Sequence, residues 1–265
     1  MIQTMKIKPF SIPSRSNRLR GVILIPQRLS HPVRTVIISH GFASNMLITS
    51  PYAKPFTDQG YIAVLYDFCM SGSGISSGKS TGMSVLTEAE NLMDLIDYVK
   101  TLPLTDENHI SLAGCSQGGL VSALTAAQRE ADIEALFLYY PALCIPDDAR
   151  RGHMITARFD PENIPDIFYA INVKLSRKYA DDAASLDPYD EICTFQKPVL
   201  IIHGIEDTLV DIDYSRKARD RYENCTMIEV HGDHGFIKSG LNESKKATAS
   251  FLEKLNARKT AADLL

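Results

Sequence analysis

Residues 110–120, Ile-Ser-Leu-Ala-Gly-Cys-Ser-Gln-Gly-Gly-Leu, decide how the rest of the chain is interpreted. The stretch begins as an apolar run typical of a buried strand, and a helical pattern follows Ser116 directly. Between them stands Gly-x-Ser-x-Gly, which in a strand-turn-helix context presents a serine as a nucleophile. Gly114 and Gly118 would let the two backbones approach in so tight a turn. Ser116 is therefore the candidate nucleophile, and a glycine-rich turn with an ordinary serine is the alternative.

The composition is that of a globular domain and excludes several classes of partner. The 265 residues are 45% hydrophobic and 23% charged, with a net charge of −4 and no block of Lys or Arg, so no nucleic-acid surface is expected. No signal peptide and no membrane-spanning run is found. The five cysteines are scattered without a Cys-x-x-Cys pair, which favours a reduced, cytoplasmic setting.

Around residues 110–120 the chain alternates between strand-like and helix-like segments. Residues 6–10 and 19–25 are expected to form an antiparallel hairpin at a sheet edge. A helix is expected over residues 85–99, with Ser84 as its N-cap. This alternation predicts an α/β fold with a mainly parallel sheet covered on both faces. The other expected strands are residues 35–39, 61–66, 133–140, 197–204 and 226–230.

One segment interrupts the alternation, between about residues 142 and 196. It is rich in proline and mixed charge, and so long an irregular stretch inside a domain is usually functional. We expect residues 1–141 and 197–265 to form the core and residues 142–196 an inserted lid. The alternative is a surface insertion without a role.

A serine nucleophile needs a base and a group that orients the base. Asp207 follows the strand-like run at residues 199–203, and His234 follows the run at residues 226–230. Carboxyl ends of parallel strands meet at one sheet edge, so both side chains are expected near Ser116. The alternatives are Asp211 or Asp213 as the acid and His231 as the base.

Three other features of the sequence have alternative interpretations. His231, Asp233 and His234 have a spacing that permits a metal site, but such a site would leave Ser116 unexplained. His40 and His203 precede glycines at strand ends and are interpreted as structural hydrogen-bonding residues. Residues 72–80 end in Gly-Lys-Ser but lack the first glycine of a phosphate loop.

Taken together, these motifs resemble the α/β-hydrolase family over nearly the whole chain. The order Ser, Asp, His is that of this fold. The resemblance implies an eight-stranded, mainly parallel sheet with helices on both faces and a small inserted lid. The matching pieces are His40-Gly41-Phe42, Gly114-Cys115-Ser116-Gln117-Gly118-Gly119, Gly204-x-x-Asp207-x-x-Val210 and Gly232-Asp233-His234-Gly235-Phe236.

Within the fold, the chain looks like the bacterial feruloyl (cinnamoyl) esterases. The similar pieces are Asp67-Phe68-x-x-Ser71-Gly72-x-Gly74-x-Ser76, Phe159-Asp160-Pro161 and Ile164-Pro165-Asp166. One departure is Cys115, where the family usually has histidine before the serine. The resemblance implies Ser116 as nucleophile, His234 as base and Asp207 as the orienting acid. It also implies that the backbone N–H groups of Phe42 and Gln117 form an oxyanion hole.

The resemblance also suggests how substrate is recognised. Asp148 and Tyr179 match an acid and a tyrosine that meet ring hydroxyls in the family, and Ile155 stands where a polar residue is used, which favours a more apolar acyl group. The alternatives are a solvated Asp148 and a packed Tyr179. Further apolar residues expected in the pocket wall are Phe159, Ile167 and Phe168.

The expected function is hydrolysis of small aryl or short-chain acyl esters, feruloyl-type first, through an acyl-enzyme and without a metal or organic cofactor. A monoacylglycerol lipase or a serine peptidase on the same fold is a second interpretation, because fold alone does not separate these. A non-catalytic binding protein is a third. The expected partner is a small ester, with neither nucleic acid nor membrane involved, and a homodimer is left open.

Overall fold

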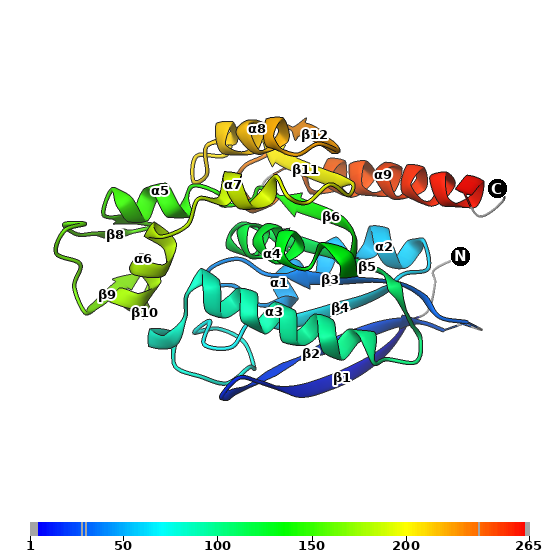
Figure 1. The fold of residues 1–265 in the computed structure, drawn as a ribbon, viewed down its shortest axis with the longest axis horizontal. Coiled ribbons are helices and arrows are strands. Elements are labelled where there is room, and N and C mark those ends of the chain that lie inside the picture. The colour runs from blue at the N-terminus through cyan, green and yellow to red at the C-terminus, as the bar shows by residue number, and fades with distance from the viewer. Residues whose placement is uncertain (1–4, 28, 30, 238, 263–265) are drawn as a thin grey trace.

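An eight-stranded sheet forms the centre of the computed structural model, which describes residues 5–27, 29, 31–237 and 239–262 (Figure 1). Its strand order is β1-β2-β4-β3-β5-β6-β11-β12. The strands are β1 (Met5–Ser14), β2 (Asn17–Pro26), β3 (Val33–Ser39), β4 (Ile62–Asp67), β5 (Thr105–Cys115), β6 (Ile133–Tyr139), β11 (Val199–Gly204) and β12 (Cys225–Val230).

Strand directions confirm the predicted fold class. β1 pairs antiparallel with β2 as an edge hairpin, and β2 pairs antiparallel with β4. Every other neighbouring pair in this sheet is parallel. The carboxyl ends of β3, β5, β6, β11 and β12 therefore point to the same edge, where polar side chains on the following turns can meet.

Both faces of the sheet are covered by helices. Successive residues of the central strands point to opposite faces, and because both sets are apolar, each face is buried under helices. Ile37 joins the core cluster that includes α3, α4 and α8, whereas Val36 and Ile38 join the cluster under α2 and α9. The predicted Ser84 cap is confirmed, since its Oγ accepts a hydrogen bond from the Thr87 amide at 3.2 Å. The helices are α1 (Met46–Thr49), α2 (Lys54–Asp58), α3 (Val85–Lys100), α4 (Gln117–Gln128), α8 (Ile212–Arg221) and α9 (Leu241–Ala262).

Residues 142–196, here called the inserted segment, contain short elements rather than an irregular loop. Figure 1 shows α5, β8, β9, β10 and α6 gathered at the end of the molecule opposite to the two chain ends. The last helix of the segment, α7, contacts α4 and α8. The elements are α5 (Ile145–Arg150), β7 (His153–Met154), β8 (Ala157–Arg158), β9 (Ile167–Ala170), β10 (Val173–Ser176), α6 (Arg177–Ala184) and α7 (Pro188–Ile192).

Residues 72–80, which partly match a phosphate-loop motif, pack against the buried side chain of Asp67. The two oxygens of Asp67 accept hydrogen bonds from the amides of Met46 and Ile75, each at 2.7 Å. A Cβ added to Gly74 would lie 2.3 Å from Asp67 Oδ2, so glycine is required for this approach. The loop thus packs against a carboxyl group of the protein itself.

No helix within the described residues combines the length and the apolar character needed to cross a bilayer.

Candidate active site

Ser116 lies in the tight turn between β5 and α4, as the motif predicts. Its φ of 53° and ψ of −121° place a non-glycine residue in a strained region, and such strain is often found at functional sites. A Cβ on Gly114 would approach the Gly118 carbonyl oxygen to 2.2 Å, and one on Gly118 would approach the His40 carbonyl oxygen to 2.3 Å. The glycines therefore serve the close backbone approach that the sequence indicates.

Ser116, His234 and Asp207 come together in one chain of hydrogen bonds. His234 Nε2 lies 3.0 Å from Ser116 Oγ, and His234 Nδ1 lies 2.7 Å from Asp207 Oδ2. An ionised carboxylate only accepts, so Nδ1 carries the proton and Nε2 is free to accept the serine proton. This is the arrangement in which a histidine acts as general base toward a hydroxyl.

Asp207 is buried and held by several donors. Its Oδ1 accepts the amides of Leu209 and Val210, each at 2.9 Å, and its Oδ2 lies 3.1 Å from His203 Nε2 as well as beside His234. Burial acts to raise the pKa of Asp207, but the hydrogen bonds from His203, His234 and Val210 outweigh it and hold the pKa well below its usual value. Asp207 is therefore a fixed negative charge against which an imidazolium can form.

The two strand-end histidines have structural hydrogen bonds. His203 accepts from Ser215 Oγ at Nδ1, at 2.7 Å, and faces Asp207 through Nε2. His40 accepts the Phe68 amide at Nε2, at 3.0 Å, and burial lowers its pKa. Both rings are thus engaged on both nitrogens, since His40 Nδ1 donates to the Gly41 carbonyl at 2.8 Å.

The rival acid and base candidates lie elsewhere. Asp211 caps α8 by accepting the Asp213 amide at 2.9 Å, and Asp213 pairs with Arg216. His231 is exposed and pairs with Glu206 at 3.1 Å. Among the described residues, no cluster of three or more His, Cys, Asp or Glu side chains could hold a metal ion.

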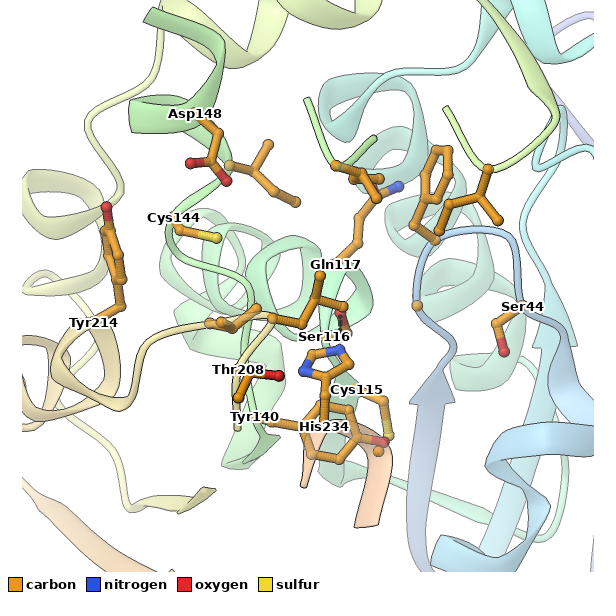
Figure 2. Close-up of a pocket in the computed structure, with 18 of the residues that line it drawn as sticks. Ser44, Cys115, Ser116, Gln117, Tyr140, Cys144, Asp148, Thr208, Tyr214 and His234 are labelled. Carbon is orange, nitrogen blue, oxygen red and sulfur yellow. Dashed lines mark hydrogen bonds between the residues drawn. The ribbon is translucent and has the colours of Figure 1, made fainter. Parts of the chain in front are cut away.

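A cavity of about 750 Å³ opens over Ser116 and continues to both sides of it. Figure 2 shows Asp148, Cys144 and Tyr214 on one side of Ser116 and Ser44 on the other. Exposed apolar side chains contribute to its wall, among them those of Ile48, Leu209 and Ile237.

The structure brings two of the three predicted substrate-contacting residues into this cavity. Asp148 and Ile155 line it, and burial raises the pKa of the partly buried Asp148 carboxyl. Tyr179 is 0% exposed, and within the described part of the chain it is not among the lining residues. Its hydroxyl donates instead to Gln117 Oε1. The position of the Tyr179 ring therefore differs from the one that a contact with substrate would require.

The apolar side chains expected beside Ile155 are also placed elsewhere. Phe159 and Phe168 pack against each other at a tilt, with ring centroids 5.1 Å apart, and Ile167 is 42% exposed. None of these three belongs to the cavity wall as far as the structure describes the chain. Ile145 and Ile171 line the cavity together with the predicted Ile155.

Phe42 and Gln117, the residues whose amides are predicted to bind an oxyanion, both line the cavity beside Ser116. Neither amide donates a hydrogen bond to another described residue. A Cβ on Gly41 would lie 3.0 Å from Ser116 Cβ, so the turn after β3 runs directly against the serine. Unpaired N–H groups at the start of α4 favour negative charge there.

Two tyrosines that no sequence motif marks, Tyr140 and Tyr52, support the turn that carries His234. The Tyr140 ring meets the His234 imidazole edge-on, with centroids 4.8 Å apart, and its backbone is held at a φ of 38° (Figure 2). Its hydroxyl lies 2.9 Å from that of Tyr52, which in turn donates to the Gly235 carbonyl at 3.3 Å. The one signal in the sequence is that Tyr140 is the last residue of a predicted strand, at the edge where Ser116 lies.

Comparison with known proteins identifies the family and the fold of the chain. The family model described as serine aminopeptidase, S33, matches residues 30–193. The chain belongs to this family. The matched range includes Ser116 but ends before Asp207 and His234, so their assignment depends on the distances above.

The solved structure of Est1E from Butyrivibrio proteoclasticus with ferulic acid bound superposes on this α/β-hydrolase with a TM-score of 0.88. The two are 29% identical, and the match covers 94% of this chain and 99% of Est1E. The uncharacterized protein YqkD of Bacillus subtilis is 25% identical over 263 residues, which is 96% of this chain and 82% of YqkD. The Pyrococcus furiosus esterase Pf2001 shares the fold, with a TM-score of 0.71 at 19% identity. The protein is thus an α/β-hydrolase of the esterase type.

Proposed function

We propose that this α/β-hydrolase is a serine carboxylesterase that acts through an acyl-enzyme on small aryl or short-chain acyl esters, with feruloyl-type esters preferred. The single observation that carries the proposal is the hydrogen-bonded chain from Ser116 through His234 to Asp207. It supplies a nucleophile, a base in the required tautomer and a buried charge behind the base.

Acylation begins when Ser116 Oγ attacks the ester carbonyl carbon and His234 Nε2 takes the hydroxyl proton. The negative charge that develops on the carbonyl oxygen faces the amides of Phe42 and Gln117. The tetrahedral intermediate collapses as the bond to the alkoxy oxygen breaks and His234 returns the proton to the leaving alcohol. Asp207 stabilises the imidazolium between these two transfers.

Deacylation repeats these steps with water in place of Ser116. His234 Nε2 takes a proton from water, the hydroxide attacks the acyl carbon, and the same two amides face the oxyanion. The bond from the acyl carbon to Ser116 Oγ then breaks, and Oγ regains its proton from His234. The carboxylic acid leaves and the enzyme returns to its starting state.

The acyl preference is supported by the lining of the cavity on the side of the inserted segment. Asp148 offers a carboxyl that can accept a hydrogen bond from a phenolic hydroxyl, and Ile155 offers an apolar contact. Est1E, at 29% identity, has been solved with ferulic acid bound. We further propose that the inserted segment acts as a lid over this side of the cavity.

A serine peptidase is the second candidate, and the description of the matched family favours it. An aminopeptidase must hold a free α-amino group, and Asp148 is a carboxylate within the cavity that could do so. The two candidates differ in the leaving group they accept, which is an alcohol for the esterase and an amine for the peptidase.

A panel of substrates tests the proposal: methyl ferulate, p-nitrophenyl butyrate, a monoacylglycerol and an aminoacyl p-nitroanilide. We expect methyl ferulate and p-nitrophenyl butyrate to be hydrolysed fastest, with a fluorophosphonate adduct on Ser116. Ser116→Ala should abolish both turnover and labelling, while Ser185→Ala, an exposed serine outside the cavity, should retain both. Faster anilide cleavage would favour the peptidase. Absence of both turnover and labelling would favour a binding protein.

A further inference from the structure

The side chain of Gln117 is held at both of its ends beneath the cavity. Its Nε2 donates to Glu88 Oε2 at 2.7 Å, and its Oε1 accepts from the Tyr179 hydroxyl. Gln117 is 1% exposed overall, so this amide group is removed from solvent. A buried carboxamide whose donor and acceptor are both satisfied by fixed partners has little freedom to turn.

This matters because of where Gln117 stands in the chain. It is the first residue of α4, and its N–H belongs to the peptide that follows Ser116. Ser116 has an unusual backbone conformation, so the orientation of that peptide is not secured by ordinary helix geometry. The peptide in question joins Ser116 to Gln117. Anchoring the side chain of Gln117 therefore restrains this peptide from its C-terminal side.

Tyr179 also reaches the second proposed oxyanion residue. Its ring meets the ring of Phe42 edge-on, with centroids 5.9 Å apart. One side chain from α6 of the inserted segment therefore touches both residues whose amides are proposed to bind the oxyanion, by its hydroxyl on Gln117 and by its ring on Phe42.

Glu88 completes the arrangement from the opposite side. It lies on α3, is 1% exposed, and burial raises its pKa to about 8, so that at neutral pH it accepts the Gln117 hydrogen bond largely as an uncharged acid. Helices α3 and α6 are themselves linked, because Ser84 Oγ donates to Asp182 Oδ2 at 2.6 Å. Three helices thus meet at the Gln117 side chain.

We propose that Tyr179 and Glu88 are positioning residues, which hold Gln117 from two sides and thereby orient the amide that stabilises the oxyanion. The inference depends on the proposed esterase function and replaces a direct substrate contact by Tyr179. Tyr179 couples the inserted segment to the reaction chemistry, whereas Asp148 and Ile155 couple it to substrate.

The two roles for Tyr179 predict different kinetics. A residue that contacts a phenolic ring affects phenolic esters and spares butyrate esters. A residue that orients an oxyanion donor affects every ester alike and lowers kcat rather than raising KM, because the oxyanion exists only near the transition state.

The test compares Tyr179→Phe with wild type on methyl ferulate and on p-nitrophenyl butyrate. We expect kcat to fall about tenfold on both esters with KM within about twofold, which is less than the loss of an oxyanion donor itself. Tyr169→Phe is the matched control, since Tyr169 is a 60% exposed tyrosine of the inserted segment outside the cavity. An unchanged kcat, or a loss confined to methyl ferulate, would overturn the inference.

Variants of Glu88 provide an independent arm. Glu88→Leu should lower kcat on both esters, and Glu88→Gln, which restores an acceptor oxygen, should recover most of that loss. Combined with Tyr179→Phe, Glu88→Leu should cost less than the product of the single effects, because both act through Gln117. Multiplicative losses, or no recovery with Gln, would count against the shared role. An inactive wild type, or an active Ser116→Ala, would instead defeat the esterase proposal itself.

Discussion

The carboxyl edge of the sheet and the inserted segment differ in how well the position of a side chain can be inferred from its place in the sequence. At the sheet edge, Ser116, Asp207 and His234 each follow a parallel strand, and parallel strands end at one edge whatever the length of the intervening chain. In residues 142–196, short hairpins and helices turn repeatedly, so neighbours in sequence face different surroundings. The order of the strands thus positions the proposed catalytic residues, whereas tertiary packing of the inserted segment positions the residues proposed for specificity.

Asp207→Asn is the substitution with the largest expected effect on the sheet-edge side of this comparison. An amide would present N–H to His234 Nδ1 or accept more weakly from it, which disturbs the tautomer that leaves Nε2 free. We expect kcat on p-nitrophenyl butyrate to fall about 10³- to 10⁴-fold with the fold intact. Asp213→Asn, on the exposed face of α8, should stay within about twofold. Similar losses in both variants would remove Asp207 from its proposed role.

Glu88→Gln tests the buried link between the two regions through the pH dependence of stability. Burial raises the Glu88 pKa from 4.5 to about 8. Between these two values the folded protein keeps a proton that the unfolded chain has released. The contribution of protonated Glu88 to the free energy of unfolding is therefore full below pH 4.5 and is lost as pH rises toward about 8.

Urea denaturation at several pH values between 5 and 8 measures this effect. The free energy of unfolding of wild type should fall, relative to Glu88→Gln, by up to about 1.4 kcal/mol per pH unit. Parallel profiles for the two proteins would mean that Glu88 is ionised throughout this range.

Much of the fold and of the proposed catalytic set is predictable from residue order, for a physical reason. Apolar runs of strand length, the glycines around Ser116 and the polar residues after two late strands are local features. The position of Tyr179 is not local. Its hydroxyl contacts a residue 62 positions away, and that residue's partner Glu88 is a further 29 positions removed. No spacing rule connects three residues on three different helices.

The same limit explains why Tyr140 and Tyr52 were missed at the well-predicted edge. Both are buried aromatic residues, a type that is usually interpreted as core. Their contact with the turn that carries His234 arises only when Tyr52, on the 3₁₀ turn η1 (Ser50–Ala53), packs against Tyr139 and Tyr140 at the end of β6. Even at the sheet edge, therefore, the residues that support the reacting groups depend on tertiary packing.

Tyr52→Phe measures how much this packing contributes. The substitution removes the hydroxyl between Tyr140 and the Gly235 carbonyl, so we expect a loss of about 1–2 kcal/mol in the free energy of unfolding. It should also lower kcat more than it raises KM, because Gly235 follows His234. Tyr61→Phe is the matched control, since Tyr61 is also buried and its hydroxyl donates to Asn256 Oδ1 outside the cavity. Equal kcat values in the two variants would limit Tyr52 to a structural role.

Asp148→Asn has the smallest expected effect and tests the inserted segment alone. A phenolic hydroxyl gives a charge-assisted hydrogen bond to a carboxylate and a weaker one to an amide. We therefore expect kcat/KM on methyl ferulate to fall about three- to tenfold, equivalent to about 1 kcal/mol, with methyl cinnamate, which has no ring hydroxyl, little changed. Asp166→Asn, an exposed carboxylate of the same segment, should leave both substrates unaffected. If both esters lose activity equally in Asp148→Asn, Asp148 shapes the cavity without recognising the ring, and the specificity proposed for the inserted segment must come from apolar contacts such as Ile155.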